Sequence, residues 1–331
     1  MNSLIQTIQH KMITSNKIPP INSLSDLISV INTSNHPDIY PLIPVIGELK
    51  TLNDMIGMKQ LKENIVYQIL YFIQNFHTVT NDYMHTVIYG PPGTGKTEIS
   101  KIIGAIYAKL GVLKKNIFKK VVRDQLVAGY LGQTALKTKE VIQSCIGGVL
   151  FIDEAYSLGT SDKVDSFAKE CIDTLCDSLS EHKHELMVII AGYEKELKEC
   201  FFNHNQGLES RFVWHFKTDE YTAKDLYYIF LKMITDIKWT YEFKETKEKD
   251  IEWFEKNKAY FKFMGRDMEN LLTKTKICHS KRVFGMNQEM KRKLTLEDLE
   301  AGFQLFSNNE RVKSRIDERR RSQEVLYSMY L

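Results

Sequence analysis

The sequence predicts an α/β fold in which a parallel sheet flanked by helices is followed by a small α-helical domain. Between about residues 85 and 216, short β-branched runs alternate with stretches whose apolar residues recur at helical spacing. From about residue 220 the strand-like runs stop and only helical patterns continue. The 331 residues are enough for two domains with separate cores.

Five buried parallel strands are expected, because each run is short, apolar and rich in β-branched or aromatic residues. Helices are expected around them from apolar spacing, and Thr222 and Thr295, each followed three residues later by Asp, predict two helix starts. The expected strands cover residues 85–89, 118–122, 149–152, 186–191 and 212–216.

Prolines, asparagines and serines crowd the beginning of the chain, which predicts short helices and loops there rather than a regular domain. Basic residues become more frequent towards the C-terminal end of the chain. The expected division is therefore a partly irregular extension (1–48), an α/β domain (49–218), a small helical domain (219–308) and a basic tail (309–331).

Charge composition excludes few function classes. The formal net charge is +3, so the balance argues neither for nor against nucleic acid as a partner. Basic clusters at 281–282, 291–293 and 319–321 could contact phosphate backbones, but interleaved acids favour solvated helix faces.

Five cysteines without a Cys-x-x-Cys pair indicate free thiols in a reducing compartment. With no apolar run of about 18 residues and no signal-like segment, a cytoplasmic protein without membrane contact is expected.

The most specific motif lies between the first expected strand and the following helix. It matches Gly-x-x-x-x-Gly-Lys-[Ser/Thr], the Walker A phosphate-binding loop, at every fixed position. Backbone N–H groups of such a loop point at phosphate oxygens, Lys96 adds positive charge for the β- and γ-phosphates, and Thr97 offers a hydroxyl to Mg²⁺. A nucleoside triphosphate and Mg²⁺ are therefore the expected ligands. The loop residues are Gly90, Pro91, Pro92, Gly93, Thr94, Gly95, Lys96 and Thr97.

A second motif ends the third expected strand. The apolar run 149–152 is followed by Asp153 and Glu154, a Walker B pattern. Ligands of open α/β sheets bind at the carboxyl ends of the strands, where Asp153 can hold Mg²⁺. Glu154 is the expected base that orients and polarises the attacking water. The two motifs together predict nucleotide hydrolysis rather than binding alone.

These motifs, with a helical domain behind them, resemble AAA+ ATPases of the P-loop NTPase class. More narrowly, they are similar to the branch that contains red-type Rubisco activase and stage V sporulation protein K. The resemblance covers about residues 50–305, and the run Gly-Gly-Val-Leu-Phe-Ile-Asp-Glu-Ala-Tyr-Ser-Leu at 147–158 is its most specific part. The other similar stretches are residues 90–97, 128–134 and 190–193.

The resemblance implies nucleotide contacts outside the two motifs. Gly57 would lie near the adenine, or in an ordinary turn before a helix. Arg211 would be an arginine finger that completes the site of a neighbouring subunit, or a surface ion pair. The helical domain would be a lid over the nucleotide. Arg266 would be its sensor 2 residue, which touches the phosphates, or an exposed residue in the first turn of a helix. Tyr193 stands where many AAA+ proteins have a polar sensor 1 residue, and its phenol could bond to water or phosphate or could pack.

Tyr130, Leu131 and Gly132 resemble the first pore loop, in which an aromatic residue of each subunit grips a threaded polypeptide. The alternative is that Tyr130 packs against its own domain. The expected function is therefore ATP hydrolysis coupled to remodelling of a protein substrate by a homo-oligomeric, hexameric ring. A nucleic-acid-stimulated motor or loader is the second hypothesis, and a nucleotide-dependent switch with negligible turnover is the third.

Overall fold

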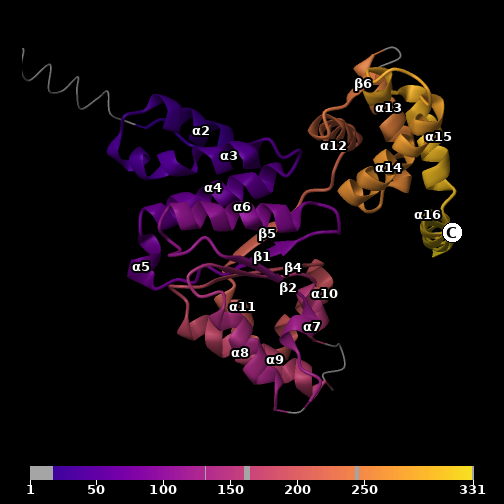
Figure 1. Cartoon of the computed structure of the whole chain (residues 1–331). Coiled ribbons are helices and arrows are strands. Elements are labelled where there is room, and N and C mark those ends of the chain that lie inside the picture. The colour runs from indigo at the N-terminus through magenta and orange to yellow at the C-terminus, as the bar shows by residue number, and fades with distance from the viewer. Residues whose placement is uncertain (1–17, 131, 160–164, 243–245, 330–331) are drawn as a thin grey trace, which may run out of the picture. The chain divides into compact units, whose positions relative to one another are not determined.

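A computed structural model describes residues 18–130, 132–159, 165–242 and 246–329 (Figure 1). The chain falls into two compact units. The first runs to Pro91 and resumes from Lys96 to Asp219, and the second comprises Pro92–Gly95 and the chain from Glu220 onwards. The short piece Pro92–Gly95 is the middle of the phosphate-binding motif.

The first unit is built on a five-stranded sheet in the order β2-β3-β4-β1-β5, with every neighbouring pair parallel. Three of its strands are buried along their whole length, as expected for a sheet covered on both faces. The predicted parallel sheet is confirmed, and each predicted strand boundary lies within two residues of the observed one. The strands are β1 (Thr86–Tyr89), β2 (Phe118–Val121), β3 (Val149–Ile152), β4 (Met187–Gly192) and β5 (Trp214–Lys217).

Helices cover both faces of this sheet (Figure 1). One face carries α2 (Leu24–Thr33), α3 (Ile46–Asn53), α4 (Lys59–Ile73) and α6 (Lys96–Lys109), with α5 (Phe76–Thr80) at their edge. The other face carries α7 (Arg123–Leu126), α8 (Thr134–Gln143), α9 (Ser166–Glu181), α10 (Glu194–Cys200) and α11 (Gln206–Arg211). The connecting 3₁₀ turns on this second face are η2 (Ala155–Leu158) and η3 (Phe202–His204).

The segment expected to be partly irregular is folded onto the first unit over its described part. Ser23 caps α2 by accepting from the backbone N–H of Asp26, and α2 buries Leu27 and Val30. Three of the prolines, Pro37, Pro41 and Pro44, lie in a 3₁₀ stretch, η1 (Pro37–Val45), which packs against α2, α3 and α6. The expected boundary at residue 48 falls inside α3, so in the structure the chain continues through it without a break in secondary structure.

The second unit is mainly helical, as predicted. Thr222 and Thr295 cap their helices in reciprocal capping boxes with Asp225 and Asp298, which confirms both predicted helix starts. The basic tail is helical over its described part. The helices are α12 (Ala223–Asp236), α13 (Lys247–Asn257), η4 (Lys258–Tyr260), α14 (Met264–Arg282), η5 (Met290–Arg292), α15 (Leu296–Ser307) and α16 (Glu310–Met329).

One prediction about this unit is wrong: strands do not stop at residue 220. β6 (Thr240–Glu242) and β7 (Lys293–Thr295) pair in parallel. Each strand has only three residues, which is too short for a period-2 pattern to stand out in the sequence. A buried polar group lies beside them, where the His279 ring and the Arg282 guanidinium both contact the Asp298 carboxylate, at 3.0 and 2.7 Å.

Candidate functional site

The carboxyl ends of neighbouring strands bring the two sequence motifs to one edge of the sheet. The Gly90 N–H, just after β1, donates to the Gly192 carbonyl at the end of β4, at 3.0 Å. The Asp153 N–H, just after β3, donates to the Val121 carbonyl of β2, also at 3.0 Å. Because all five strands are parallel, the phosphate-binding loop, the acidic pair and Tyr193 leave the sheet at the same edge. This edge, at the carboxyl ends of the strands, is the motif edge.

The phosphate-binding loop is a tight turn closed by its own lysine. The Lys96 ammonium donates to the carbonyls of Gly90, at 2.9 Å, and Pro91, at 2.7 Å. Gly93 and Gly95 both have φ near +80°, which is costly for residues with a side chain. Thr97 lies in the first turn of α6, where the positive end of the helix dipole favours anions.

The middle of the loop makes its contacts within the second unit. The Gly265 N–H donates to the Gly93 carbonyl at 3.0 Å, and the Tyr221 hydroxyl donates to the Thr94 carbonyl at 3.3 Å. A Cβ atom at Gly93 would lie 2.1 Å from the Phe263 carbonyl oxygen, so only glycine fits there.

Asp153 and Glu154 differ sharply in their surroundings. The half-buried Asp153 carboxylate pairs with Lys120 of β2, whose ammonium lies 2.5 Å from Oδ2. Glu154 is exposed and adopts a left-handed backbone, with φ 51° and ψ 45°. That conformation costs a residue with a side chain about 1–2 kcal/mol and often marks functional positions. Sequence reasoning missed Lys120, since the register between β2 and β3 that places it there is not visible in the sequence.

Two tyrosines stand beside the acidic pair. Tyr193, directly after β4, is 36% exposed, and its ring lies 6.1 Å from the ring of Tyr156. Burial, with a smaller effect of Glu154, raises the pKa of Tyr156 to about 12, so its phenol stays protonated at neutral pH. The Tyr193 side chain is therefore partly exposed and packs near a second ring.

Arg211 is not grouped with these residues. Its Nε donates to the Ser180 hydroxyl of α9 at 2.7 Å, and its Nη1 donates to the Gly207 carbonyl at 2.5 Å. The side chain is half-buried at the end of α11, whose start is capped by Asn205. Within one chain, Arg211 is thus held by its own unit rather than aimed at the phosphate-binding loop.

The remaining predicted residues lie in turns. Tyr130 is 74% exposed between α7 and α8, next to the exposed Gly132, while Leu131 lies outside the described residues. The alternative that Tyr130 packs against its own domain is therefore not what the structure shows. Gly57 has φ 70° in the turn before α4, and Arg266 is an exposed residue in the first turn of α14.

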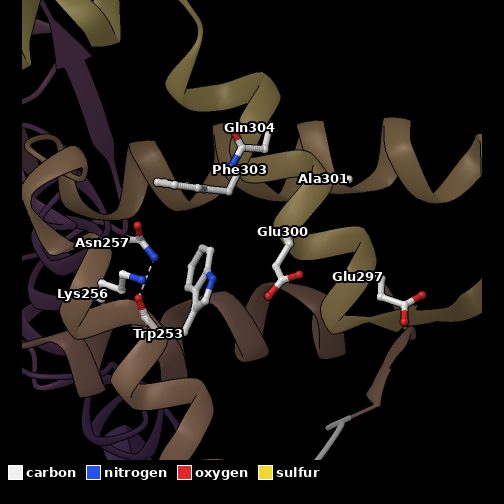
Figure 2. Close-up of a pocket in the computed structure, with 8 residues that line it drawn as sticks. All are labelled: Trp253, Lys256, Asn257, Glu297, Glu300, Ala301, Phe303 and Gln304. Carbon is white, nitrogen blue, oxygen red and sulfur yellow. Dashed lines mark hydrogen bonds between the residues drawn. The ribbon is translucent and has the colours of Figure 1, made fainter.

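A groove of about 550 Å³ lies elsewhere, between α13 and α15 of the second unit (Figure 2). The rings of Trp253 and Phe303 meet edge to face at its centre, 5.1 Å apart. None of the residues singled out from the sequence lines it. Its lining is Trp253, Lys256, Asn257, Glu297, Glu300, Ala301, Phe303 and Gln304.

The donor set at the motif edge fits a hard divalent cation. Thr97 supplies a hydroxyl and Asp153 a carboxylate, the oxygen ligands that Mg²⁺ prefers, and Lys120 shows that a cation is favourable at the Asp153 oxygen. Over the described ranges, no group of three or more His, Cys, Asp or Glu side chains could hold a metal ion. In the same ranges, no helix is long and apolar enough to cross a membrane.

Comparison with known proteins identifies the family. The profile described as "ATPase family associated with various cellular activities (AAA)" matches residues 86–203. A CfxQ homolog of Pyropia yezoensis is 36% identical over 290 residues, which cover 83% of this chain and 94% of that protein. The chain belongs to the AAA ATPase family.

Two further relatives place this AAA ATPase in the branch that the resemblance predicted. A cfxQ-like protein of Acanthamoeba polyphaga mimivirus is 40% identical over 274 residues, 81% of this chain and 66% of that protein. Stage V sporulation protein K of Bacillus subtilis is 36% identical over 193 residues, 56% of this chain and 59% of that protein. The chain thus spans only about two thirds of the length of these two relatives.

Solved structures confirm the fold of the AAA ATPase. The FIGL-1 AAA domain in complex with ADP superposes with a TM-score of 0.57 at 16% identity, over 90% of this chain and 96% of that one. The Holliday junction branch migration motor RuvB of Thermotoga maritima superposes with a TM-score of 0.52 over 77% of this chain and 71% of that one. As a member of this family, the chain carries an AAA ATPase domain.

Proposed function

We propose that this AAA ATPase uses ATP hydrolysis to remodel a protein substrate, and that it works as a homo-oligomeric ring, expected to be a hexamer. Tyr130 carries the proposal. An aromatic side chain that is 74% exposed, in a loop with glycines at 129 and 132, contributes little to folding and is suited to gripping another chain. The names of two relatives support a protein-directed role: the sporulation protein above, and the ESX-3 secretion system protein EccA3 of Mycobacterium tuberculosis, 37% identical over 188 residues.

The motif edge supplies the chemistry in this proposal. Thr97 and Asp153 would hold Mg²⁺, which neutralises charge on the β- and γ-phosphates when bound. The loop residues 90–95 offer backbone N–H groups to the phosphates, and Lys96 exchanges its two carbonyl partners for phosphate oxygens. Glu154, exposed and held in a fixed backbone conformation, orients the attacking water as general base.

The remaining contacts come from residues outside the motifs. In this proposal Tyr193 bonds to water or to the γ-phosphate, Arg266 contacts the phosphates, and Gly57 lies against the adenine. Arg211 acts on the ATP bound by a neighbouring subunit, where it stabilises charge in the transition state. To do so, its guanidinium releases Ser180 and Gly207, so the hydrogen bonds seen within one chain represent its position before assembly.

The alternative, a nucleic-acid motor, finds less support in the late basic clusters. Arg282 pairs with Asp298 at 2.7 Å, and Lys293 pairs with Glu242 at 3.0 Å. Cations already paired with carboxylates of their own unit have less to gain from phosphate contacts. Retention of polypeptides in ATP, compared with stimulation of the ATPase by DNA, distinguishes the two functions.

The test uses Glu154→Gln protein, which is expected to hold ATP without hydrolysing it. The protein is incubated with nuclease-treated extract and ATP, and the bound polypeptides are compared with those bound in ADP. Polypeptides that the Glu154→Gln protein retains in ATP, and no longer retains when Tyr130→Ala is introduced into the same chain, support remodelling. Tyr40→Ala is the matched control, because Tyr40 is a tyrosine of similar exposure, 56%, far from the motif in sequence. Equal retention with and without Tyr130, or ATPase stimulation by DNA that weakens with salt, would overturn the proposal.

A further inference from the structure

We propose that Arg315, on the C-terminal helix α16, is a positioning residue for ATP turnover, and that it acts through the turn at the start of α14. The inference rests on the proposed function, because it takes the phosphate-binding loop and Arg266 to contact the nucleotide. It adds a connection between the C-terminal helix and the nucleotide site. Neither sequence motif contains this connection. All of the residues involved belong to the second unit.

The first step of the link is a buried ion pair. The Arg315 Nη1 atom lies 3.1 and 3.3 Å from the two Asp267 carboxylate oxygens, and Nη2 lies 3.4 Å from Oδ1. The Asp267 side chain is 1% exposed and that of Arg315 is 15% exposed. The guanidinium also stacks over the Phe263 ring, 4.7 Å from its centre. A planar, forked cation that pairs and stacks at once is fixed in orientation in a way that a lysine is not.

The second step is the turn that this ion pair braces. The Asp267 carboxylate also accepts the Phe263 N–H at 2.8 Å, which ties the residue before α14 to the first turn of the helix. The Phe263 carbonyl in turn accepts the Arg266 N–H at 3.0 Å. Arg315 therefore contacts both the ring of Phe263 and the carboxylate that holds its backbone.

The third step joins the turn to the phosphate-binding loop. The Gly265 N–H donates to the Gly93 carbonyl at 3.0 Å. The two backbones approach so closely that a Cβ at Gly265 would lie 2.7 Å from that carbonyl oxygen. A shift of the turn between Phe263 and Arg266 therefore moves the Gly93 peptide and the Arg266 side chain together. Because coupling between two sites is reciprocal, nucleotide bound at the loop also has to stabilise α16.

The first experiment measures this reciprocity in the unmodified protein. Amide hydrogen exchange is followed with ADP and Mg²⁺ and without nucleotide. We expect slower exchange in the loop, in residues 263–267 and in residues 310–318. Protection of the loop without any change in 310–318 would overturn the link from Arg315 while leaving nucleotide binding, and so the proposed function, intact. Absence of protection at the loop itself would count against the proposed function.

The second experiment separates positioning from simple structural support. Arg315→Met is expected to lower kcat by roughly tenfold, because a small displacement of phosphate contacts is costly, and Arg315→Lys to lower it less. Lys313→Met, an exposed cation on the same helix, is the control and should retain the unmodified kcat. Thermal unfolding shows which variants are folded.

The double variant Arg315→Met, Asp267→Asn decides between the two roles. It removes the unpaired buried charge and keeps an amide oxygen for the Phe263 N–H, so the unfolding temperature should recover. If Arg315 positions the turn, kcat stays low in this double variant. Recovery of kcat together with stability, or a kcat within twofold of the unmodified value in folded Arg315→Met, would overturn the proposal.

Discussion

The Lys120 ammonium lies 2.5 Å from Oδ2 of Asp153, the carboxylate expected to bind Mg²⁺. Lys120 also lies over the ring of Phe151, its direct partner in the parallel pairing of β2 and β3. A side chain cation and a metal ion cannot occupy the same carboxylate oxygen. Mg²⁺ binding therefore has to displace Lys120 or share Asp153 with it.

Removing this competing cation should make Mg²⁺ binding easier. Lys120→Met is expected to lower the Mg²⁺ concentration at half-maximal ATPase activity by a few-fold, since a partly exposed ion pair is worth about 1 kcal/mol or less. The measurement is a Mg²⁺ titration at saturating ATP. Lys119→Met serves as control, because Lys119 on the same strand bonds to Ser144 instead. An unchanged or higher midpoint in Lys120→Met would show that Lys120 does not compete.

Mixing two inactive variants tests whether Arg211 acts on a neighbouring subunit. Arg211→Ala and Glu154→Gln should each lower kcat by about a thousandfold. In a mixed ring, a site with intact Glu154 can meet a neighbour with intact Arg211, so about a quarter of the sites should recover in a 1:1 mixture. A mixture of Arg211→Ala with a chain that carries both Arg211→Ala and Glu154→Gln gives the background, because no site in it has both groups. If the first mixture is no more active than this background, Arg211 does not act in trans.

Gly93 can be tested against a glycine that shares its backbone but not its contacts. Gly93 and Gly111 have φ values of +80° and +76°, yet a Cβ at Gly111 would meet nothing within 4 Å. Gly111→Ala is expected to cost about 1 kcal/mol of unfolding free energy from backbone strain alone. Gly93→Ala should cost more, because its Cβ would collide with the Phe263 carbonyl. Denaturant unfolding of both variants makes the comparison, and equal losses would contradict it.

Acid should destabilise the first unit through His85. Burial lowers the pKa of this ring to about 4 from 6.5, and the ring accepts from the Val188 N–H and bonds to the Leu179 carbonyl. Between these two pH values the unfolded chain binds a proton that the native ring does not. The free energy of unfolding therefore decreases as pH falls from 6.5, by about 3 kcal/mol at pH 4.

The check is unfolding of His85→Gln across the same pH range. Its stability should fall less steeply between pH 6.5 and 4 than that of the unmodified protein. His184→Gln, at an exposed histidine, should keep the original slope. Parallel slopes in all three proteins would show that His85 does not set the acid response.

The sheet and its two motifs could be predicted because their signals are local. A buried parallel strand is a short apolar run, and the loop after β1 is a fixed pattern of eight residues. The contacts that complete the site are not local. Lys120 reaches Asp153 through strand register, and Arg315 reaches Asp267 across 48 positions, so neither pair is visible before the chain is folded. Arg211 could be singled out by resemblance, but its hydrogen bond to Ser180 depends on the packing of α11 against α9.

Gly93 occupies a position at which the phosphate-binding motif accepts any amino acid. In this protein the position is closed all the same, because the Phe263 carbonyl and the backbone of α14 fill the space where a side chain would begin. The identity of that residue is set by a helix more than 160 positions later in the chain and not by the phosphates. A substitution there would disable the enzyme through its fold while leaving every fixed letter of the motif intact.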